Sequence, residues 1–436
     1  MKTKLIIFGM SGDLGRRKLI PALANIVAQN AIPDLSVIGI SRRNIDVAQL
    51  LSGAKAPKNA LHKLQTITNF YQMDLANVAD YDQLKDFLGD AKDTQLLFYL
   101  SVPPSAATDI VDNLGQAGIN GARVKIMFEK PFGFDLTSAH EMIDRTARYF
   151  KEAQIYRVDH YLEKEMAQNI IAMRYGNALF SQIWDNKTID SIDIVASEKI
   201  GIEGRSIFYE QTGALRDVLQ GHVMQLLALT LAKIPEQFNW ADLPKMRLAA
   251  LQQLVIARPD DSLRGQYHGY RDEVKNPNSM TETVAGVKLF SQDSAFTGVP
   301  IRLLTGKKLA SKTTEIHLNL KRKHADQENT VIFRIQPNDG VAMRLLVKKP
   351  GLAVGPRQFI TETSGFSFPS DVKLADAYEQ IFVDAASAHK SLFASSDEII
   401  RQWEILDPVQ KAWSLDRTPL KLYNPGTEAK HLLAKF

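Results

Sequence analysis

The segment "KLIIFGMSGDLGRRK" (residues 4–18) gives the clearest indication of the fold expected for the first part of the chain. It begins with a short β-rich run and continues into a turn that contains Gly9, Gly12 and Gly15. A strand that leads through such a turn into a helix lets backbone N–H groups approach a pyrophosphate at the helix N-terminus. The spacing is GxxGxxG rather than the usual GxGxxG. By itself it is therefore also compatible with an ordinary tight turn.

The segments that follow repeat this alternation of strand and helix. Further β-rich runs lie at 35–41, 95–102 and 123–130, and helical apolar spacing lies at 16–30 and 105–117. Buried parallel strands read as continuous apolar runs, and helices between them imply right-handed crossovers. We therefore predict a Rossmann-like, doubly wound parallel α/β domain over residues 1–158.

The pattern changes after this point. Helical spacing lies at 160–181, along "GALRDVLQGHVMQLLALTLAK" and at about 374–404, and strand-like runs lie at "SIDIVASEKIG", 284–291, 313–320, 330–336 and 341–348. Successive strands with short links favour a large, mainly antiparallel sheet. We predict a larger α+β domain over residues 159–436.

Composition limits the function classes. The chain has 436 residues, and its 53 basic and 49 acidic side chains give a net charge of only +4, which does not favour nucleic acid as a partner. The absence of cysteine excludes disulfides and thiolate sites, and the nine histidines show no metal-ligand spacing, so no metal is expected. No apolar run is long enough for a membrane span or a signal peptide. We expect a soluble, cytoplasmic protein.

Two predicted strands end in basic residues. The second ends at "GISRRN", with Arg42 and Arg43 where an NAD-binding domain usually carries an acid for the ribose 2′-hydroxyl. Arginine accommodates a 2′-phosphate, so we favour NADP over two solvated surface arginines. The fourth ends at "FEKPFG", which places Lys130 at the carboxyl edge, where ligands of open α/β sheets bind. The alternative is a surface lysine before a turn.

The segment "RVDHYLEKEM" (157–166) contains many side chains that can bind a ligand or take part in a reaction. If it is helical from about Asp159, then His160 and Lys164 are i,i+4 neighbours and Tyr161 and Lys164 are i,i+3 neighbours. The free N–H groups of a first turn would complete a cradle for a phosphate. A solvated helix, in which Lys164 pairs with neighbouring acids, is an equal alternative.

His222 is the best candidate for a general base. It lies in an apolar helical run, five residues after Asp217. A lone histidine on such a face is more often a core residue. However, oxidation of an alcohol by hydride transfer requires removal of the hydroxyl proton, and an imidazole can be tuned for this by a carboxylate partner.

Together the motifs resemble one family, the glucose-6-phosphate dehydrogenases. They are, in order, "FGMSGDLGRRK", "YLSVPP", "EKPFG", "RVDHYLEKE", "NALFSQIWDN", "GALRDVLQGH", "VPIRLLTGKKLASK" and "FRIQPNDG". Each motif is weak alone, but the ordered set covers nearly the whole chain and is specific.

The resemblance implies a role for each matching residue. His222 would take the proton from the C1 hydroxyl, and Asp159 would orient its ring. The sugar phosphate would be held by His160, Tyr161 and Lys164, the sugar hydroxyls by Glu198 and Asp217, and further substrate contacts would come from Lys307 and Lys312. Lys130 would bridge substrate and coenzyme, and coenzyme contacts would come from Gly9, Ser11, Gly12, Asp13, Leu14, Lys18 and Arg42.

The implied activity is oxidation of glucose 6-phosphate at C1 to 6-phosphogluconolactone, the first step of the oxidative pentose phosphate pathway. The coenzyme would be NADP, with NAD use left open, and the chain would form a homodimer through the large sheet. Two alternatives remain open. One is a sugar dehydrogenase like glucose–fructose oxidoreductase, which does not explain "RVDHYLEKE", and the other is a non-catalytic NADP-binding paralogue.

The chain also departs from the family pattern. Gly221 stands where the family usually has Asn before its base, and Glu163 stands where it commonly has Gly. A glycine inside a helix is unfavourable by roughly 1 kcal/mol relative to Ala. The expected chemical groups are still present.

Overall fold

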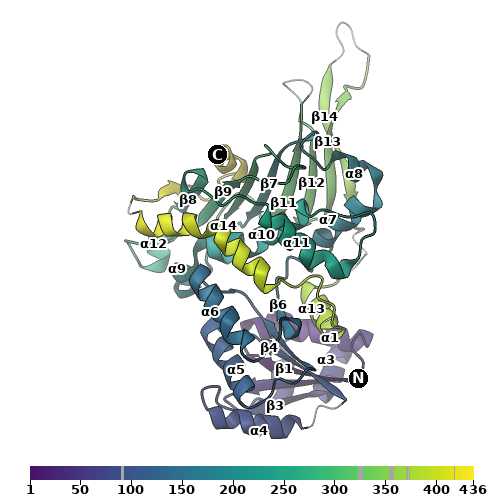
Figure 1. Cartoon of the computed structure of the whole chain (residues 1–436), viewed down its shortest axis with the longest axis vertical. Helices are drawn as coiled ribbons and strands as arrows, with labels where there is room; N and C mark the ends of the chain where they lie inside the picture. The colour runs from purple at the N-terminus through teal and green to yellow at the C-terminus, as the bar shows by residue number, and fades with distance from the viewer. Residues whose placement is uncertain (90–92, 323–327, 353–357, 370–371, 373, 417) are drawn as a thin grey trace. The chain divides into compact units, whose positions relative to one another are not determined.

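The computed structural model describes residues 1–89, 93–322, 328–352, 358–369, 372, 374–416 and 418–436. The chain forms two compact units (Figure 1). Unit 1 contains Met1–Glu163, Trp240–Pro244 and Ala375–Ile400, and unit 2 contains Lys164–Asn239, Lys245–Leu374 and Arg401–Phe436. The boundary predicted at 158/159 falls near the end of the first segment of unit 1, which also takes in a segment from the C-terminal part of the chain.

Unit 1 is built on a six-stranded parallel sheet with the order β3-β2-β1-β4-β5-β6. Its strands are β1 (Lys2–Phe8), β2 (Leu35–Ser41), β3 (Thr68–Gln72), β4 (Thr94–Leu100), β5 (Val124–Phe128) and β6 (Ile155–Arg157). The predicted doubly wound parallel sheet is confirmed. The sequence reading missed β3, whose side chains are mostly exposed or half-buried, and β6, which has only three residues.

Helices connect these strands. They are η1 (Gly15–Leu19), α1 (Ile20–Gln29), α2 (Val47–Ser52), α3 (Lys58–Thr66), α4 (Val78–Leu88), α5 (Pro104–Gln116), α6 (Leu136–Ala147) and η2 (Glu152–Gln154). The helix predicted over 16–30 begins as the π-helical turn η1, and Pro21 is the second residue of α1, which continues η1 directly. The core includes Leu5, Ile7 and Leu97, all fully buried.

The helix α13 (Ala377–Ala386) returns to this sheet from the far end of the chain. Lys125 Nζ donates to Ala385 O at 2.5 Å, and Gln95 Nε2 donates to Ala386 O at 2.9 Å. The rings of Tyr99 and Phe382 also pack together, at a centroid distance of 5.2 Å. These contacts attach α13 to strands β4 and β5.

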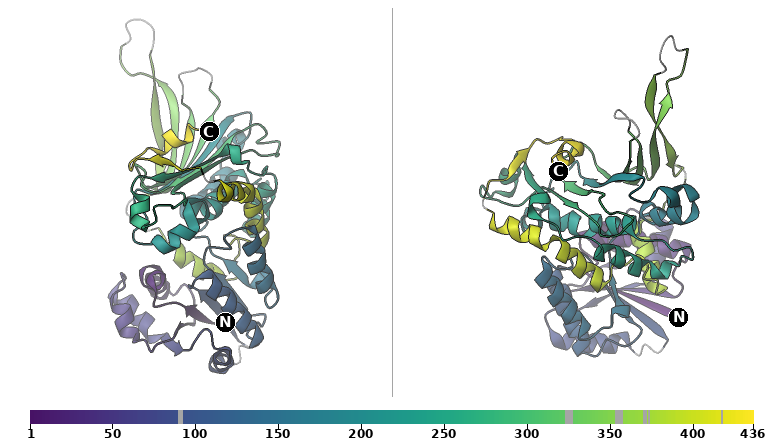
Figure 2. Two further views of the ribbon diagram at one scale, coloured as in Figure 1. Left: turned by 90° about the vertical axis from the view of Figure 1, so that its left-hand side faces the viewer. Right: turned by 45° about the horizontal axis from the view of Figure 1, so that its top comes forward.

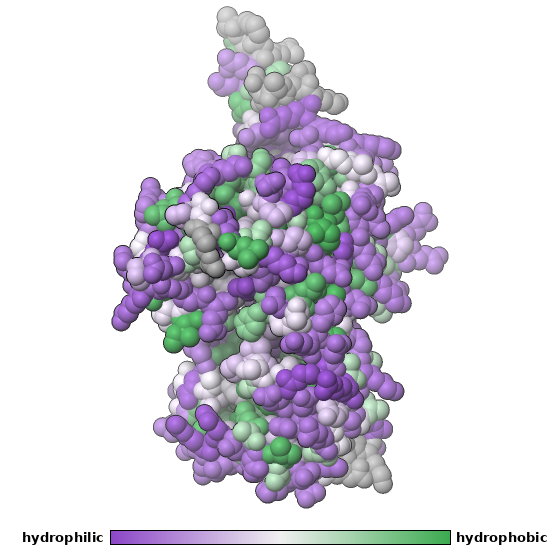
Figure 3. Space-filling view, turned by 60° about the vertical axis from the view of Figure 1, so that its left-hand side comes forward, coloured by the Kyte–Doolittle hydropathy of each residue, from purple (hydrophilic) through white to green (hydrophobic). Residues whose placement is uncertain are grey.

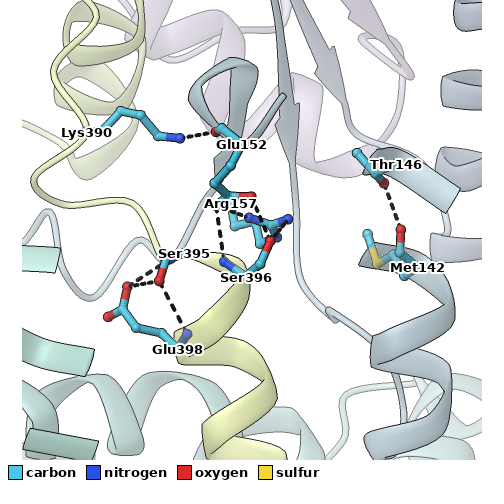
Figure 4. A network of polar contacts seen from close by, with 8 residues as sticks. All are labelled: Met142, Thr146, Glu152, Arg157, Lys390, Ser395, Ser396 and Glu398. Atoms are coloured by element: carbon cyan, nitrogen blue, oxygen red, sulfur yellow. Dashed lines mark hydrogen bonds and ion pairs between the residues drawn. The ribbon is translucent and has the colours of Figure 1, made fainter. Parts of the chain in front are cut away.

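A polar network fixes the segment after α13 (Figure 4). Buried Arg157 pairs with Glu152 at 2.8 Å and donates to Ser396 Oγ at 2.7 Å, and Ser396 Oγ in turn donates to Glu152 at 2.6 Å. Lys390 donates to the Glu152 carbonyl. Arg157, the first residue of the segment "RVDHYLEKEM", therefore has a structural role within unit 1.

Unit 2 is built on a nine-stranded sheet with the order β14-β13-β12-β11-β7-β10-β9-β8-β15. Its strands are β7 (Ile189–Ser197), β8 (Ser262–Tyr267), β9 (Val284–Leu289), β10 (Ile301–Gly306), β11 (Thr313–Leu320), β12 (Thr330–Gln336), β13 (Gly340–Lys348), β14 (Phe359–Ser367) and β15 (Lys421–Tyr423). Only the pairs β7/β10 and β8/β15 are parallel, so the predicted mainly antiparallel sheet is confirmed. Figure 2 shows β13 and β14 extending beyond the neighbouring strands.

The remaining helices belong mostly to unit 2. They are α7 (Glu165–Gly176), α8 (Ala178–Ile183), α9 (Ser206–Ala214), η3 (Leu215–Val223), α10 (Met224–Leu231), η4 (Trp240–Asp242), α11 (Leu243–Gln252), η5 (Pro259–Asp261), α12 (Tyr270–Val274), α14 (Ser396–Leu415) and α15 (Ala429–Leu433). The π-helix η3 packs against β7, β9 and β10.

The visible surface is predominantly hydrophilic, with hydrophobic side chains in small separated groups (Figure 3). Among the described residues, no helix combines the length and the apolar character that crossing a membrane requires.

Candidate active site

The glycine turn after β1 is tightly packed in unit 1. Gly9 has φ +81°, and a Cβ there would lie 2.2 Å from the carbonyl oxygen of Ser101, the residue after β4. The Gly12 N–H donates to Gly9 O at 2.9 Å, and a Cβ on Gly15 would lie 1.9 Å from Met10 O. Only glycine fits at positions 9 and 15. The turn therefore presents backbone at the carboxyl edge of the sheet, as a dinucleotide-binding turn requires.

The side chains around the turn are held by neighbours in sequence and by one residue from the C-terminal part of the chain. Asp13 pairs with Arg17 at 2.8 Å on the surface, and Arg16 Nε donates to Ser11 O at 2.9 Å, while Leu14 packs on the core. Lys18 Nζ pairs with Asp376, the N-cap of α13, at 3.0 Å. The predicted coenzyme contacts of this turn thus lie together.

Arg42 and Arg43 follow β2 and are exposed. Gln72 Nε2 donates to the Arg42 carbonyl at 3.1 Å, and the Arg43 N–H donates to Ser41 Oγ at 3.1 Å, so the backbone is fixed. Within the ranges that the structure describes, neither guanidinium has a hydrogen-bond or ion-pair partner. Both are available to an anion at the same edge of the sheet.

Lys130 lies two residues after β5, at the carboxyl edge as predicted. Its neighbour Glu129 accepts a hydrogen bond from Tyr99, and burial raises the pKa of Glu129 against the opposing effects of Tyr99, Tyr378 and Lys130. Tyr378 belongs to α13, and its ring stacks on His160 with a centroid distance of 6.2 Å and an interplanar angle of 16°. Tyr378, from the C-terminal part of the chain, thus lies at the carboxyl edge of the parallel sheet.

The segment 157–164 differs from the predicted helix. Helix α7 begins at Glu165, and Lys164 is its N-cap with extended backbone (φ −70°, ψ 136°), while 160–163 form a turn. Asp159 is 2% exposed, and its carboxylate accepts the Tyr161 N–H at 3.0 Å. The expectation of a helix from Asp159 is wrong because this local bond stabilises a turn instead.

The same segment is also buried rather than solvated. Tyr161 is 9% and Glu163 is 4% exposed, and the rings of His160 and Tyr161 meet edge to face at 5.1 Å. The alternative of a solvated helix is therefore wrong too. Lys164, which begins unit 2, lies close enough to Asp339 to lower the pKa of that carboxyl against the larger effect of burial.

His222 and Asp217 lie on the π-helix η3, which interrupts the predicted continuous helix between α9 and α10. A π-helix bonds residue i to i+5, so residues five apart lie nearly one turn above each other. Asp217 and His222 therefore share a side of η3, which an α-helix would not allow. His222 is 6% exposed, and Gln220 beside it is also buried.

Three of the predicted substrate residues come together in unit 2. Lys307 follows β10 and Glu198 follows β7, and because these strands are parallel neighbours their carboxyl ends meet. Lys307, which is 2% exposed, pairs with Glu198 and lies 3.5 Å from Asp217. Its ammonium also lies over the ring of Tyr209 at 5.1 Å. A buried ammonium between two carboxylates can orient hydroxyl groups.

Lys312 does not join this cluster. It precedes β11 and is exposed, and no described residue bonds to its side chain. The sequence reading also missed Glu129, Asp376 and Tyr378. The last two had no local signal, because only the return of α13 brings them to the sheet edge.

The comparisons with known proteins cover both parts of the chain. Residues 6–169 match the NAD binding domain of glucose-6-phosphate dehydrogenase, and residues 171–435 match its C-terminal domain. The chain belongs to the glucose-6-phosphate dehydrogenase family. The predicted family is confirmed.

Relatives in the glucose-6-phosphate dehydrogenase family match along almost their full length. The glucose-6-phosphate 1-dehydrogenase of Chlamydia muridarum is 32% identical over 97% of this chain and 92% of the relative. The glucose-6-phosphate 1-dehydrogenase of Dickeya dadantii is 33% identical over 97% of this chain and 94% of the relative. A solved glucose-6-phosphate dehydrogenase in complex with its substrate glucose-6-phosphate has a TM-score of 0.91 at 27% identity, covering 100% of this chain and 96% of that one.

Proposed function

We propose that the protein oxidises glucose 6-phosphate at C1 with NADP, yielding 6-phosphogluconolactone as in the oxidative pentose phosphate pathway. The observation that carries this proposal is the match of both domain families along almost the whole chain. The cluster of Lys307, Glu198 and Asp217 beside the helix of His222 supports it, because it combines hydroxyl-binding groups with a base.

His222 takes the proton of the C1 hydroxyl as the C1 hydride leaves, which turns the C–O bond into the carbonyl of the lactone. Bound NADP supplies the hydride acceptor. Asp159, carried over from the family resemblance, is the carboxylate partner that orients His222 and stabilises its charged form.

Substrate binding is divided among several side chains. Glu198 and Asp217 accept hydrogen bonds from sugar hydroxyls, and Lys307 pairs with both carboxylates and fixes their positions. The phosphate is bound by His160, Tyr161 and Lys164, and Lys312 makes a further contact with the substrate. Lys130 lies between sugar and coenzyme.

The chain's residues fit a phosphorylated dinucleotide. A Cβ at Gly9 would lie 2.2 Å from Ser101 O, so the start of the turn brings bare backbone to the sheet edge, which is what close approach of a pyrophosphate needs. Lys18 lies on the helix that follows, and exposed Arg42 supplies a cation for a 2′-phosphate.

We also propose that the chain is a cytoplasmic homodimer joined through the nine-stranded sheet, with residues 1–158 binding the coenzyme and 159–436 binding substrate and forming the dimer. The absence of cysteine fits a reducing compartment. Light scattering in solution should give twice the mass of 48.7 kDa. A monomer would contradict the assembly but not the reaction.

The activity is tested by following reduced nicotinamide with glucose 6-phosphate or free glucose and with NADP or NAD. We expect turnover of the phosphorylated sugar with NADP.

His222→Asn should lower kcat by about 10²–10⁴-fold with little change in substrate binding. His268→Asn, at an exposed position of unit 2, is the matched control and should keep wild-type turnover. Unchanged turnover in His222→Asn would remove His222 as the base, and equal use of free glucose would favour a non-phosphorylated sugar as substrate.

A further inference from the structure

The start of the π-helix η3 is held by a single acidic residue, Glu282, which precedes β9. The Leu215 N–H donates to Glu282 Oε1 at 3.0 Å, and the Ala214 N–H donates to the Glu282 carbonyl at 3.0 Å. The first N–H groups of a helix have no partner within the helix. Glu282 satisfies two of them at once, one with its side chain and one with its backbone.

Gly213 makes this contact possible. Its backbone (φ 66°, ψ 179°) lies in a region that is essentially restricted to glycine, and it breaks the helix between α9 and η3. A Cβ on Gly213 would lie 2.4 Å from Glu282 Oε1. The carboxylate therefore occupies the space that any other side chain at position 213 would need.

The residue after Glu282 connects the same segment to the lysine of the site. Thr283 O accepts the Lys307 N–H at 2.9 Å, and the Thr283 N–H donates to Gly265 O at 2.8 Å. Tyr423 OH also donates to Lys307 O at 2.6 Å. Because the Lys307 ammonium lies 3.5 Å from Asp217 on η3, residues 282 and 283 anchor both partners of that ion pair.

We propose that Glu282 is a positioning residue, which sets the place of η3 and thereby of Asp217 and His222 relative to Lys307. The inference rests on the proposed function for the roles of those three residues. Glu282 itself does not touch the reacting atoms. It acts through the backbone of Leu215, so the reach of its side chain matters more than its charge.

The surroundings of Glu282 agree with this. Burial raises the pKa of Glu282, against the opposing effects of Leu215, Arg216 and Arg264. Glu282 also lines a cavity of about 290 Å³ together with Arg216, Arg264 and Trp413. A shorter side chain at position 282 could therefore retract toward this space and leave the Leu215 N–H without its acceptor.

Two conservative variants separate reach from charge. Glu282→Gln keeps an oxygen at the position that accepts from Leu215, so its kcat should stay close to that of the wild type. Glu282→Asp keeps the charge but is one methylene too short, and a misplaced base should lower kcat by about 10- to 100-fold. Affinity for NADP should be unchanged in both, since Glu282 belongs to unit 2. Glu210→Gln is the control, because Glu210 lines the same cavity but bonds to Tyr270, Asn276 and Ser279.

Amide hydrogen exchange of residues 214–223 provides a readout that does not depend on activity. Exchange should be faster in Glu282→Asp than in the wild type or Glu282→Gln. The proposal is overturned if Glu282→Asp keeps wild-type kcat and exchange, or if Glu282→Gln is the more damaged variant, since charge would then be what matters. If instead His222→Asn keeps full turnover, the proposed base fails, while the exchange data still decide whether Glu282 holds η3.

Discussion

At the scale of single residues, Arg42 carries the coenzyme preference that we propose. It is exposed directly after β2, and its backbone is fixed by Gln72, so its guanidinium can face a ligand at the sheet edge without losing another partner. Hydrogen bonds to charged groups are worth roughly 1.5–3 kcal/mol, which corresponds to roughly ten- to a hundredfold in affinity.

Arg42→Ala should therefore weaken NADP by about that factor and change NAD little, because NAD lacks the 2′-phosphate. Fluorescence titration with the reduced forms of both coenzymes measures this. NAD serves as the internal control for damage to the fold. Equal weakening of both coenzymes would count against recognition of the 2′-phosphate.

Lys164 is the residue to test for the phosphate of the sugar. Lys164→Ala should chiefly raise the KM for glucose 6-phosphate, by roughly tenfold or more, because a charge-assisted bond to the phosphate is lost. Lys187→Ala removes an exposed lysine elsewhere in unit 2 and should leave the KM unchanged. An equal effect of Lys164→Ala on free glucose would contradict a role in phosphate binding.

At the scale of elements, the turn between β1 and η1 shows how backbone packing prepares a site. Gly9 lies against Ser101, and Gly15 lies against Met10, so a side chain at either position would clash with backbone. Close backbone packing and the bond from Arg16 Nε to Ser11 O together define the shape of the turn.

Gly15→Ala should disturb this turn, since its Cβ would lie 1.9 Å from Met10 O. Overpacking of this kind costs roughly 1–3 kcal/mol, and we expect weaker NADP binding and a lower Tm. Gly53→Ala is the matched control, because no heavy atom lies within 4 Å of a Cβ there. NADP affinity in Gly15→Ala equal to that of the control would show that the turn does not bind the coenzyme.

The helices and strands also show which features local sequence patterns can predict and which they cannot. The strands at 313–320 and 330–336 were predicted with their observed bounds, because alternation and apolar runs are local signals. The helix expected from Asp159 failed because one side-chain bond to the Tyr161 N–H outweighs helical spacing. The π-helix η3 around His222 was missed because the spacing of its apolar residues is also typical of an α-helix.

At the scale of the whole molecule, two lysines of unit 1 link stability to pH. Burial lowers the pKa of Lys125 to about 8, where it donates to Gln95 and Ala385. Burial also lowers the pKa of Lys390 to about 8, against the opposing effect of Glu152. Both pKa values lie below the ordinary lysine value of 10.5, so between pH 8 and 10.5 the unfolded chain binds more protons than the folded one.

Stability contributed by these groups should therefore rise as the pH increases from about 8 toward 10.5, and stay constant below 8. Lys125→Met should remove its part of that rise, so the difference in Tm between variant and wild type should depend on pH. Thermal unfolding at neutral pH and at a pH above 8 measures it. Lys58→Met, an exposed lysine of α3, should follow the wild type, and parallel curves for Lys125→Met would contradict the lowered pKa.

Sequence patterns alone predicted the parallel sheet, the antiparallel sheet, the glycine turn, the basic ends of β2 and β5, and the family. The structural predictions depend on residues close together in the chain, where periodicity and turn chemistry act, and the family prediction depends on the order of such local motifs along the chain. The folded chain was needed to show that α13 returns to β4 and β5, that Lys307 lies between Glu198 and Asp217, and that Glu282 holds the start of η3. These contacts join residues far apart in sequence, and their partners are chosen by strand order and by burial, which no local pattern encodes.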